Sequence, residues 1–322
     1  MQVSTFHNRA RELLCSVIVP TCHRPDFLAV CLERLAPGRQ TLAACHYEVV
    51  VTDDSRNSAS RQMVHERFPW ARWAAGPRRG PAANRNQGAR EARGTWLAFV
   101  DDDCQPEPTW LGELTPAVDE SELDVVEGRT VCPGKQDSPF QEQVENLTGG
   151  LYWSCNLAMR RETFLRLGGF DEDFEEAGGE DMEFAWRIRQ AGLETRFAPA
   201  ACVLHPPRRI SWRKLWWRTL MIRWMLLYWL KTGQAPPLRA SPTRVYSQLL
   251  HRQLLDLART TVHLVTRFER GAWRRRFFFQ IWKWATFPVV LPYLFLWEAR
   301  FRKLLALRTA TSANPFPSLA RG

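Results

Sequence analysis

Three consecutive acids, Asp101, Asp102 and Asp103, follow directly on the short apolar run at residues 95–100. The run contains β-branched and aromatic residues and comes after Gly94, so it is typical of a buried β-strand. Three adjacent carboxylates repel one another unless a cation lies between them. A divalent metal would remove that repulsion and bind phosphate oxygens as well, because hard cations take both kinds of ligand. The stretch predicts a metal–phosphate site or, as the simpler alternative, a solvated acidic turn.

A second carboxylate pair, Glu180 and Asp181, follows two glycines and precedes the helical spacing of residues 182–190. Acids at a helix N-terminus stabilise the helix dipole, and this is their simplest role. On a flexible glycine entry, a carboxylate can also act as a base on a bound hydroxyl group. His205 follows a strand-like stretch and is either a structural histidine or a metal ligand.

The elements that must position these acids alternate between strand and helix along the first part of the chain. The expected strands are 14–20, 47–51 and 95–100, and the expected helices include 26–35, 58–68 and 182–190. The second strand, like the third, ends in acids, Asp53 and Asp54. Strands that end in acids and are separated by helices predict an α/β fold, in which a parallel sheet has its crevice at one edge.

Residues 76–94 form a loop rich in glycine and proline that leads into a helix carrying Arg85 near its start. An arginine at a helix N-terminus that faces the crevice would suit a diphosphate. The simpler alternative is a surface arginine on an ordinary helix.

Charge divides the 322-residue chain unevenly. Residues 1–205 hold 22 Lys+Arg against 31 Asp+Glu, whereas residues 206–322 hold 22 against 3, together with 9 of the 15 Trp. A basic, Trp-rich region indicates an anionic partner, either a membrane or a nucleic acid. The eight cysteines lack zinc-like spacing and the first 30 residues lack a signal-peptide core, which favours reduced thiols in a cytosolic protein.

Two segments of the basic region favour the membrane. Residues 211–231 contain five Trp and are typical of an interfacial helix. Residues 277–297 are long enough to span, but Lys283, Pro288 and Pro292 interrupt them, so we expect an interfacial or re-entrant segment. Both segments are more apolar than nucleic-acid grooves require, so no nucleic-acid partner is expected. A helical subdomain packed on the first part remains the alternative.

The motifs of residues 14–206 resemble, in order, those of the inverting nucleotide-sugar glycosyltransferases of family 2, which have a GT-A fold. The similar stretches are SVIVPT, VVVTDDS, ANRNQGAREARG, FVDDD, GGFDE, GGED and the final histidine. The resemblance implies a mostly parallel sheet flanked by helices, with a catalytic domain at residues 1–206. Residues 207–322 would then form a basic, Trp-rich helical region associated with a membrane.

The resemblance also implies roles for individual residues. The donor nucleotide is expected to lie against Pro20, Thr21, Arg24, Asp54, Arg85, Asp101 and Asp102. Asp103 would bind Mg²⁺ or Mn²⁺ with His205 as a second ligand, while Asp181 would be the catalytic base with Glu180 beside it. Two departures affect the donor pocket: Cys22 and His23 replace the usual Tyr–Asn of the first loop, and the second strand lacks the glycine of D-D-G-S.

These residues predict a metal-dependent, inverting, non-processive transferase. It would move a sugar from a UDP-, GDP- or dTDP-sugar to a glycan or lipid-linked acceptor, at the cytoplasmic face of an anionic membrane. Single displacement needs a base on the acceptor hydroxyl and neutralisation of the departing diphosphate, and the acids and metal would supply both. The alternatives are a processive polysaccharide synthase and a non-catalytic binding protein on a transferase fold.

Overall fold

The computed structural model describes residues 13–115, 122–134, 138, 140–233, 251, 254–255, 258–259, 262 and 270–311. These residues belong to two compact units. The first unit joins the chain up to Pro133 with residues 144–206, and the second joins residues 134–143 with the chain from Pro207 onward. The short segment 134–143 therefore belongs to the second unit, although the residues before and after it belong to the first. The sequence did not indicate this arrangement.

An eight-stranded sheet forms the centre of the first unit, in the order β3-β2-β1-β4-β8-β6-β9-β5. Its strands are β1 (Cys15–Thr21), β2 (Tyr47–Asp53), β3 (Arg72–Ala75), β4 (Trp96–Phe99), β5 (Gln105–Pro106), β6 (Val125–Val131), β8 (Leu157–Arg160) and β9 (Thr195–Leu204). The pairings of β1 with β2 and β4, of β2 with β3, and of β6 with β9 are parallel, while β8 and β5 run against their neighbours. The expected mostly parallel α/β sheet is confirmed.

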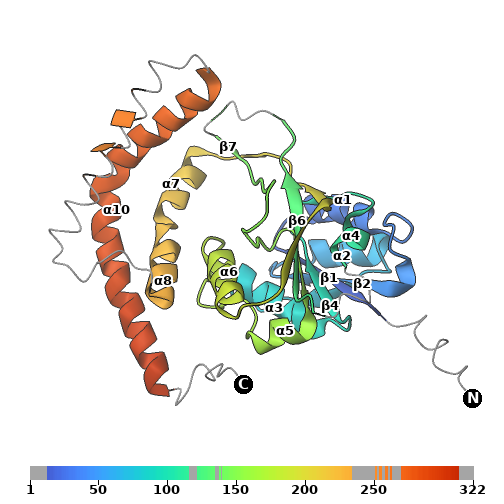
Figure 1. The fold of residues 1–322 in the computed structure, drawn as a ribbon. Helices are drawn as coiled ribbons and strands as arrows, with labels where there is room; N and C mark the ends of the chain where they lie inside the picture. The colour runs from blue at the N-terminus through green and yellow to red at the C-terminus, as the bar shows by residue number, and fades with distance from the viewer. Residues whose placement is uncertain are drawn as a thin grey trace, which may run out of the picture. The chain divides into compact units, whose positions relative to one another are not determined.

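Helices cover both faces of this sheet (Figure 1). One face packs against α1 (Pro25–Leu35), α2 (Ala59–Arg67) and α4 (Trp110–Leu114), and the other against α3 (Pro81–Glu91), α5 (Arg161–Arg166) and α6 (Glu180–Gln190). Alternation along β1 produces the two cores, because Val17 and Val19 point to the first face and Ile18 to the second. A strand buried on both faces explains the continuous apolar run in the sequence.

The second unit contains a two-stranded ribbon and three described helices. The ribbon pairs β7 (Gln141–Glu142) with β10 (Arg208–Arg209), and the helices are α7 (Trp212–Leu220), α8 (Ile222–Thr232) and α10 (Arg270–Thr311). The single helix expected over 211–231 is thus two helices that meet at Met221. No helix among the described residues is long and apolar enough to cross a membrane.

Residues 277–297, expected to be an interfacial or re-entrant segment, lie within one continuous helix, α10, despite Pro288 and Pro292. A proline inside a helix removes one hydrogen bond and usually kinks it. Here aromatic packing along α10 offsets that cost: the Trp297 and Phe301 rings both lie against Trp224 of α8, with centroids 6.4 and 6.0 Å away. Tertiary packing of this kind is invisible in a window of sequence.

Candidate active site

The carboxyl ends of four strands bring the predicted residues to one edge of the sheet. Thr21 ends β1, Asp53 ends β2, Asp101 follows β4 closely and His205 follows β9. The Thr21 hydroxyl donates to Oδ2 of Asp102 over 2.7 Å, so it ties the end of β1 to the loop after β4. This edge is where open α/β sheets bind their ligands, because the loops diverge there.

Two arginines neutralise the three adjacent acids. Arg24, at the start of α1, lies 2.5 Å from Oδ1 of Asp102 and 2.9 Å from Oδ2 of Asp103. Arg85, from α3, lies 2.8 Å from Oδ1 of Asp101. The two guanidinium groups therefore offset the repulsion expected among three carboxylates. Both arginines were expected from the family resemblance to lie beside the donor nucleotide.

The acids differ in their ionisation because their surroundings differ. Burial raises the pKa of Asp102 to about 7, although Arg24 and Thr21 oppose the shift. Burial acts in the same direction on Asp101, but the Arg85 guanidinium outweighs it and lowers the pKa of that carboxyl. Asp101 is thus held as an anion, while the protonation of Asp102 is balanced near neutral pH.

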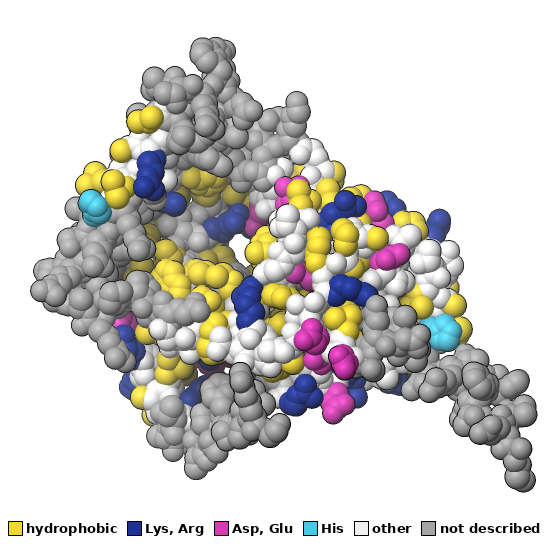
Figure 2. Space-filling model, viewed as in Figure 1, with side chains coloured by type: hydrophobic (Ala, Val, Ile, Leu, Met, Phe, Trp, Pro, Cys, Tyr) yellow, Lys and Arg dark blue, Asp and Glu magenta, His cyan; other side chains and the backbone are white. Residues whose placement is uncertain are grey.

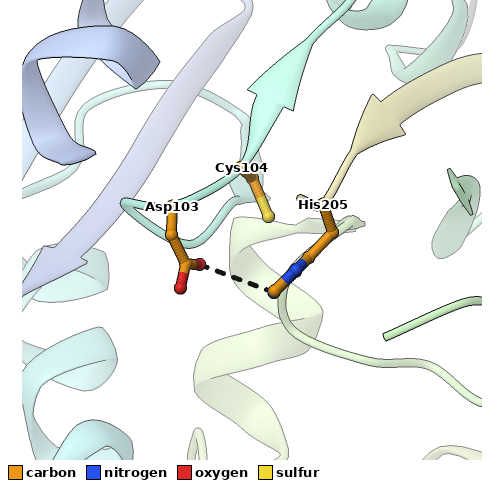
Figure 3. A group of neighbouring side chains, drawn as sticks. All are labelled: Asp103, Cys104 and His205. Atoms are coloured by element: carbon orange, nitrogen blue, oxygen red, sulfur yellow. Dashed lines mark ion pairs between the residues drawn. The ribbon is translucent and has the colours of Figure 1, made fainter. Parts of the chain in front are cut away.

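Asp103 and His205 lie together with a third residue, Cys104 (Figure 3). All three side chains are buried, and their ligand atoms lie within 4.8 Å of one another. Nε2 of His205 is 3.5 Å from Oδ1 of Asp103. A carboxylate, an imidazole and a thiol are all metal ligands, so this donor set fits a divalent ion. The sequence analysis missed Cys104, which it counted only among reduced thiols; its place directly after the acids was the available signal.

The second carboxylate pair opens α6, as expected. Gly178 and Gly179 both have positive φ, 136° and 128°, so glycine is required at this entry. Glu180 is buried and accepts a hydrogen bond from the Gly178 amide over 2.6 Å. Desolvation, followed by the charge of Glu180, raises the pKa of Asp181 to about 7. A carboxyl balanced between its two forms near neutral pH has the property required of a general base.

Arg85 connects the two groups of acids. Besides Asp101 it contacts Glu180, whose Oε1 lies 3.5 Å from Nη1. Burial opposes its charge, but the carboxylates of Asp101, Asp181 and Glu180 together raise the pKa of this arginine above its usual value. Arg85 therefore stays cationic, and it holds the end of β4 and the start of α6 in one arrangement.

Asn86 explains why a G-G-F-D-E stretch accompanies these motifs. Its amide nitrogen donates to the Phe170 carbonyl over 2.8 Å, and its oxygen accepts from the Phe170 amide over 2.9 Å. A Cβ on Gly169 would lie only 2.5 Å from that oxygen, so the close approach requires glycine. The Phe170 ring then lies under the Arg85 guanidinium, 5.7 Å from its centroid, and helps to orient it.

Two other residues expected beside the donor, Pro20 and Asp54, lie at the ends of β1 and β2. Pro20 is buried within β1. Oδ1 of Asp54 accepts the Arg78 amide over 2.8 Å, so this carboxylate closes the turn before α3, and burial raises its pKa. Asn84, which the sequence analysis did not select, donates to the carbonyls of Thr21 and Thr52 and so joins the ends of β1 and β2.

A mostly parallel α/β sheet with acids, arginines and a possible metal-ligand group at its carboxyl edge is typical of α/β proteins that bind their ligands at that edge. Within that class, the model of the family described as "Glycosyl transferase family 2" matches residues 16–183, just over half of the chain. The chain belongs to this family, and the GT-A fold expected from the sequence agrees with that membership.

Several curated proteins are similar to this chain. Validoxylamine A glucosyltransferase of Streptomyces hygroscopicus subsp. jinggangensis is 28% identical over 226 residues, covering 56% of this chain and 52% of the relative. Glycosyltransferase AglE of Haloferax volcanii is 24% identical over 208 residues, covering 60% and 67%. The chain spans about half the length of the first of these relatives.

Among solved structures, TarS residues 1–349 of S. aureus in complex with UDP-GlcNAc is 22% identical, with a TM-score of 0.49. The likeness covers 65% of this chain and 65% of that one.

Proposed function

We propose that this protein transfers a sugar from a nucleotide-sugar donor to an acceptor hydroxyl by a metal-dependent, inverting, single displacement. The observation that carries the proposal is the position of Arg85, which contacts Asp101 on the metal side and Glu180 on the base side. These two contacts would hold both halves of a displacement reaction at one edge of the sheet. Family membership gives the proposal its reaction class.

The donor is proposed to lie along the ends of β1 and β4, with its diphosphate near Arg24 and Arg85. Guanidinium groups match phosphate oxygens in charge and geometry. Asp103 and His205 would hold Mg²⁺ or Mn²⁺, which when bound neutralises charge on the departing diphosphate. Charges among buried, fixed dipoles act more strongly than in solution.

Asp181 is proposed as the base that accepts the proton of the acceptor hydroxyl. Its pKa of about 7 lets it be deprotonated at neutral pH and still be basic enough to take a proton. Attack by that hydroxyl on the face opposite the diphosphate inverts the anomeric carbon. Glu180 contacts Arg85 and accepts a hydrogen bond from the Gly178 amide, so it would position the start of α6 beside the base.

The acceptor is proposed to be a lipid-linked or cell-surface glycan at the cytoplasmic face of an anionic membrane, which the second unit would contact. Helix α7 exposes Trp212, Trp216 and Trp217. Hydrophobic side chains gather at the surface over α7 and α8 (Figure 2). Aromatic and basic side chains on one helix are typical of binding at the lipid headgroup level.

The direct test is transfer itself. Full-length protein is incubated with UDP-, GDP- and dTDP-sugars, Mg²⁺ or Mn²⁺, and lipid-linked or free glycan acceptors. The expected result is one added sugar whose anomeric configuration, measured by NMR, is opposite to that of the donor. A retained configuration would reject single displacement, and a long polymer from one acceptor would reject the non-processive mode.

A further inference from the structure

Cys104 has a buried side chain that the proposed reaction does not use. It lies in the short connection between β4 and β5, where its amide donates to the Asp101 carbonyl over 3.0 Å. Its exposed fraction is 0%, and its sulfur belongs to the same group of ligand atoms as the Asp103 carboxylate and the His205 ring. Figure 3 shows the sulfur pointing toward the space between those two side chains.

The sheet places Cys104 opposite His205. Strands β5 and β9 are antiparallel, and Gln105 of β5 pairs with Leu204 of β9. One step further along this ladder, the residue before Gln105 faces the residue after Leu204. His205 is held there by its own amide, which donates to the Val131 carbonyl over 2.8 Å. Backbone pairing thus brings Cys104 and His205 side by side on the two strands.

The spacing of the three donor atoms suits a single small ion. Around a tetrahedral ion with bonds of about 2.0–2.3 Å, ligand atoms lie about 3.3–3.6 Å apart. Nε2 of His205 and Oδ1 of Asp103 are already 3.5 Å apart. The sulfur lies within 4.8 Å of both, so a small side-chain rotation brings it into range.

We propose that Cys104 is a third protein ligand of the metal held by Asp103 and His205, and that it makes the site selective for transition-metal dications over Mg²⁺. This inference rests on the proposed function, and it adds a third ligand to the proposed metal site. Sulfur and imidazole favour the borderline and softer ions, whereas Mg²⁺ demands oxygen ligands in a near-ideal octahedron. Of the two ions expected from the sequence, the trio favours Mn²⁺, and it favours Co²⁺ and Zn²⁺ more strongly still.

The test uses Co²⁺, because a thiolate bound to Co²⁺ gives an intense charge-transfer band in the near ultraviolet. The metal-free protein is titrated with Co²⁺, and the band is compared in wild type, Cys104→Ser and Cys15→Ser. Cys15 is the matched control, because it is a buried cysteine of the same core that lies outside the trio, at the start of β1. We expect the band at one equivalent in wild type and Cys15→Ser. In Cys104→Ser the band should vanish, and Co²⁺ affinity should fall about tenfold or more while Mg²⁺ affinity changes little.

Co²⁺ bound by the wild-type protein without the band would overturn the role of Cys104 and leave Asp103 and His205 as ligands. A band that persists in Cys104→Ser, or that disappears in Cys15→Ser, would overturn it equally. X-ray absorption spectroscopy of the wild-type Co²⁺ complex tests the same point without a variant. It should detect a sulfur atom about 2.3 Å from the Co²⁺ ion. The proposed transferase function fails separately, if the protein binds no nucleotide-sugar or transfers no sugar with any metal.

Discussion

Nη1 of Arg24 lies 2.9 Å from Oδ2 of Asp103, the carboxylate proposed as a metal ligand. The same guanidinium also contacts Asp102, so without a metal it neutralises the acids itself. A dication placed on Asp103 competes with this arginine for the negative charge of the same carboxylate, although Arg24 contacts Oδ2 and the His205 ring lies nearer Oδ1. Release of Arg24 toward the donor diphosphate would then couple metal binding to donor binding, because the freed cation has a new anionic partner.

Replacing Arg24 with Gln is expected to have opposite effects on two ligands. Without nucleotide, Mn²⁺ affinity should rise about 1.4- to fivefold, because a partly exposed ion pair contributes about 0.2–1 kcal/mol. UDP affinity in the presence of Mn²⁺ should fall instead, since a phosphate contact is lost. Calorimetric titrations measure both, with Arg39→Gln as an exposed-arginine control. Weaker Mn²⁺ binding in Arg24→Gln would show that Arg24 supports the metal site and does not compete with it.

Asp103→Asn is expected to abolish metal-dependent binding of nucleoside diphosphate and to leave the fold intact. The amide keeps the shape of the side chain but removes the charge that holds the ion, and loss of metal affinity of at least about 10–100-fold is expected. Titration with UDP and GDP, with and without Mn²⁺, measures the effect, and circular dichroism checks the fold. The exposed acid Asp26 supplies the control Asp26→Asn. Binding that is unchanged and metal-independent in Asp103→Asn would remove Asp103 from the site.

Asp181→Asn is expected to lose turnover by about 10²–10⁴-fold with nearly unchanged donor affinity, because a base acts on the acceptor and not on the nucleotide. Glu180→Gln should be milder, since Glu180 acts through Arg85 and the helix entry. The exposed neighbour Glu175 gives the control Glu175→Gln. Equal losses in the two variants would put the choice of base in question, and wild-type turnover in Asp181→Asn would refute it.

The pH dependence of turnover follows from the raised pKa of Asp181. The base works only when deprotonated, so below a pKa of about 7 the rate should fall about tenfold per pH unit. Above that pKa the rate should level off, because the carboxylate is then fully ionised. The profile of kcat/KM, measured with saturating Mn²⁺, tests this, and Glu175→Gln should keep the same shape. A profile that stays flat down to pH 5 would mean that no group with this pKa is the base.

The sequence predicted the strands and their acidic ends because both depend on local pattern: an apolar run forms a buried strand, and parallel strands end at the same edge. His205 and Asp103 could be paired only through the family resemblance, since they follow different strands, β9 and β4. The ion pair of Arg85 with Glu180 joins α3 to α6, and no pattern in the sequence indicates it. Packing also accommodates Pro288 and Pro292 inside one continuous helix, α10, which the sequence alone did not indicate.

The second unit should bind anionic vesicles through both charge and aromatic side chains. Residues 206–322 carry 22 basic against 3 acidic residues, and each Lys or Arg near an anionic surface contributes about 1 kcal/mol. The carboxylate of Glu142 forms ion pairs with three basic side chains, with N–O distances of 3.6 Å to Arg208, 3.6 Å to Lys214 and 3.2 Å to Arg218. Because one acid faces three bases, this cluster keeps a net positive charge. Salt should therefore weaken the binding, while burial of Trp at about 25 cal/mol per Å² should keep part of it.

Sedimentation of the full-length protein with phosphatidylserine-containing and purely zwitterionic vesicles measures both contributions. The double variant Trp212→Ala/Trp217→Ala removes the most exposed rings of α7 and should lose the salt-resistant part, whereas Arg213→Gln should reduce only the salt-sensitive part. Leu165→Ala, an exposed apolar residue of α5 in the first unit, is the matched control and should sediment like wild type. Protein that never sediments, or that binds both vesicle types equally at every salt concentration, would exclude an anionic membrane as the partner. The basic, Trp-rich helices would then serve the acceptor by some route other than lipid contact.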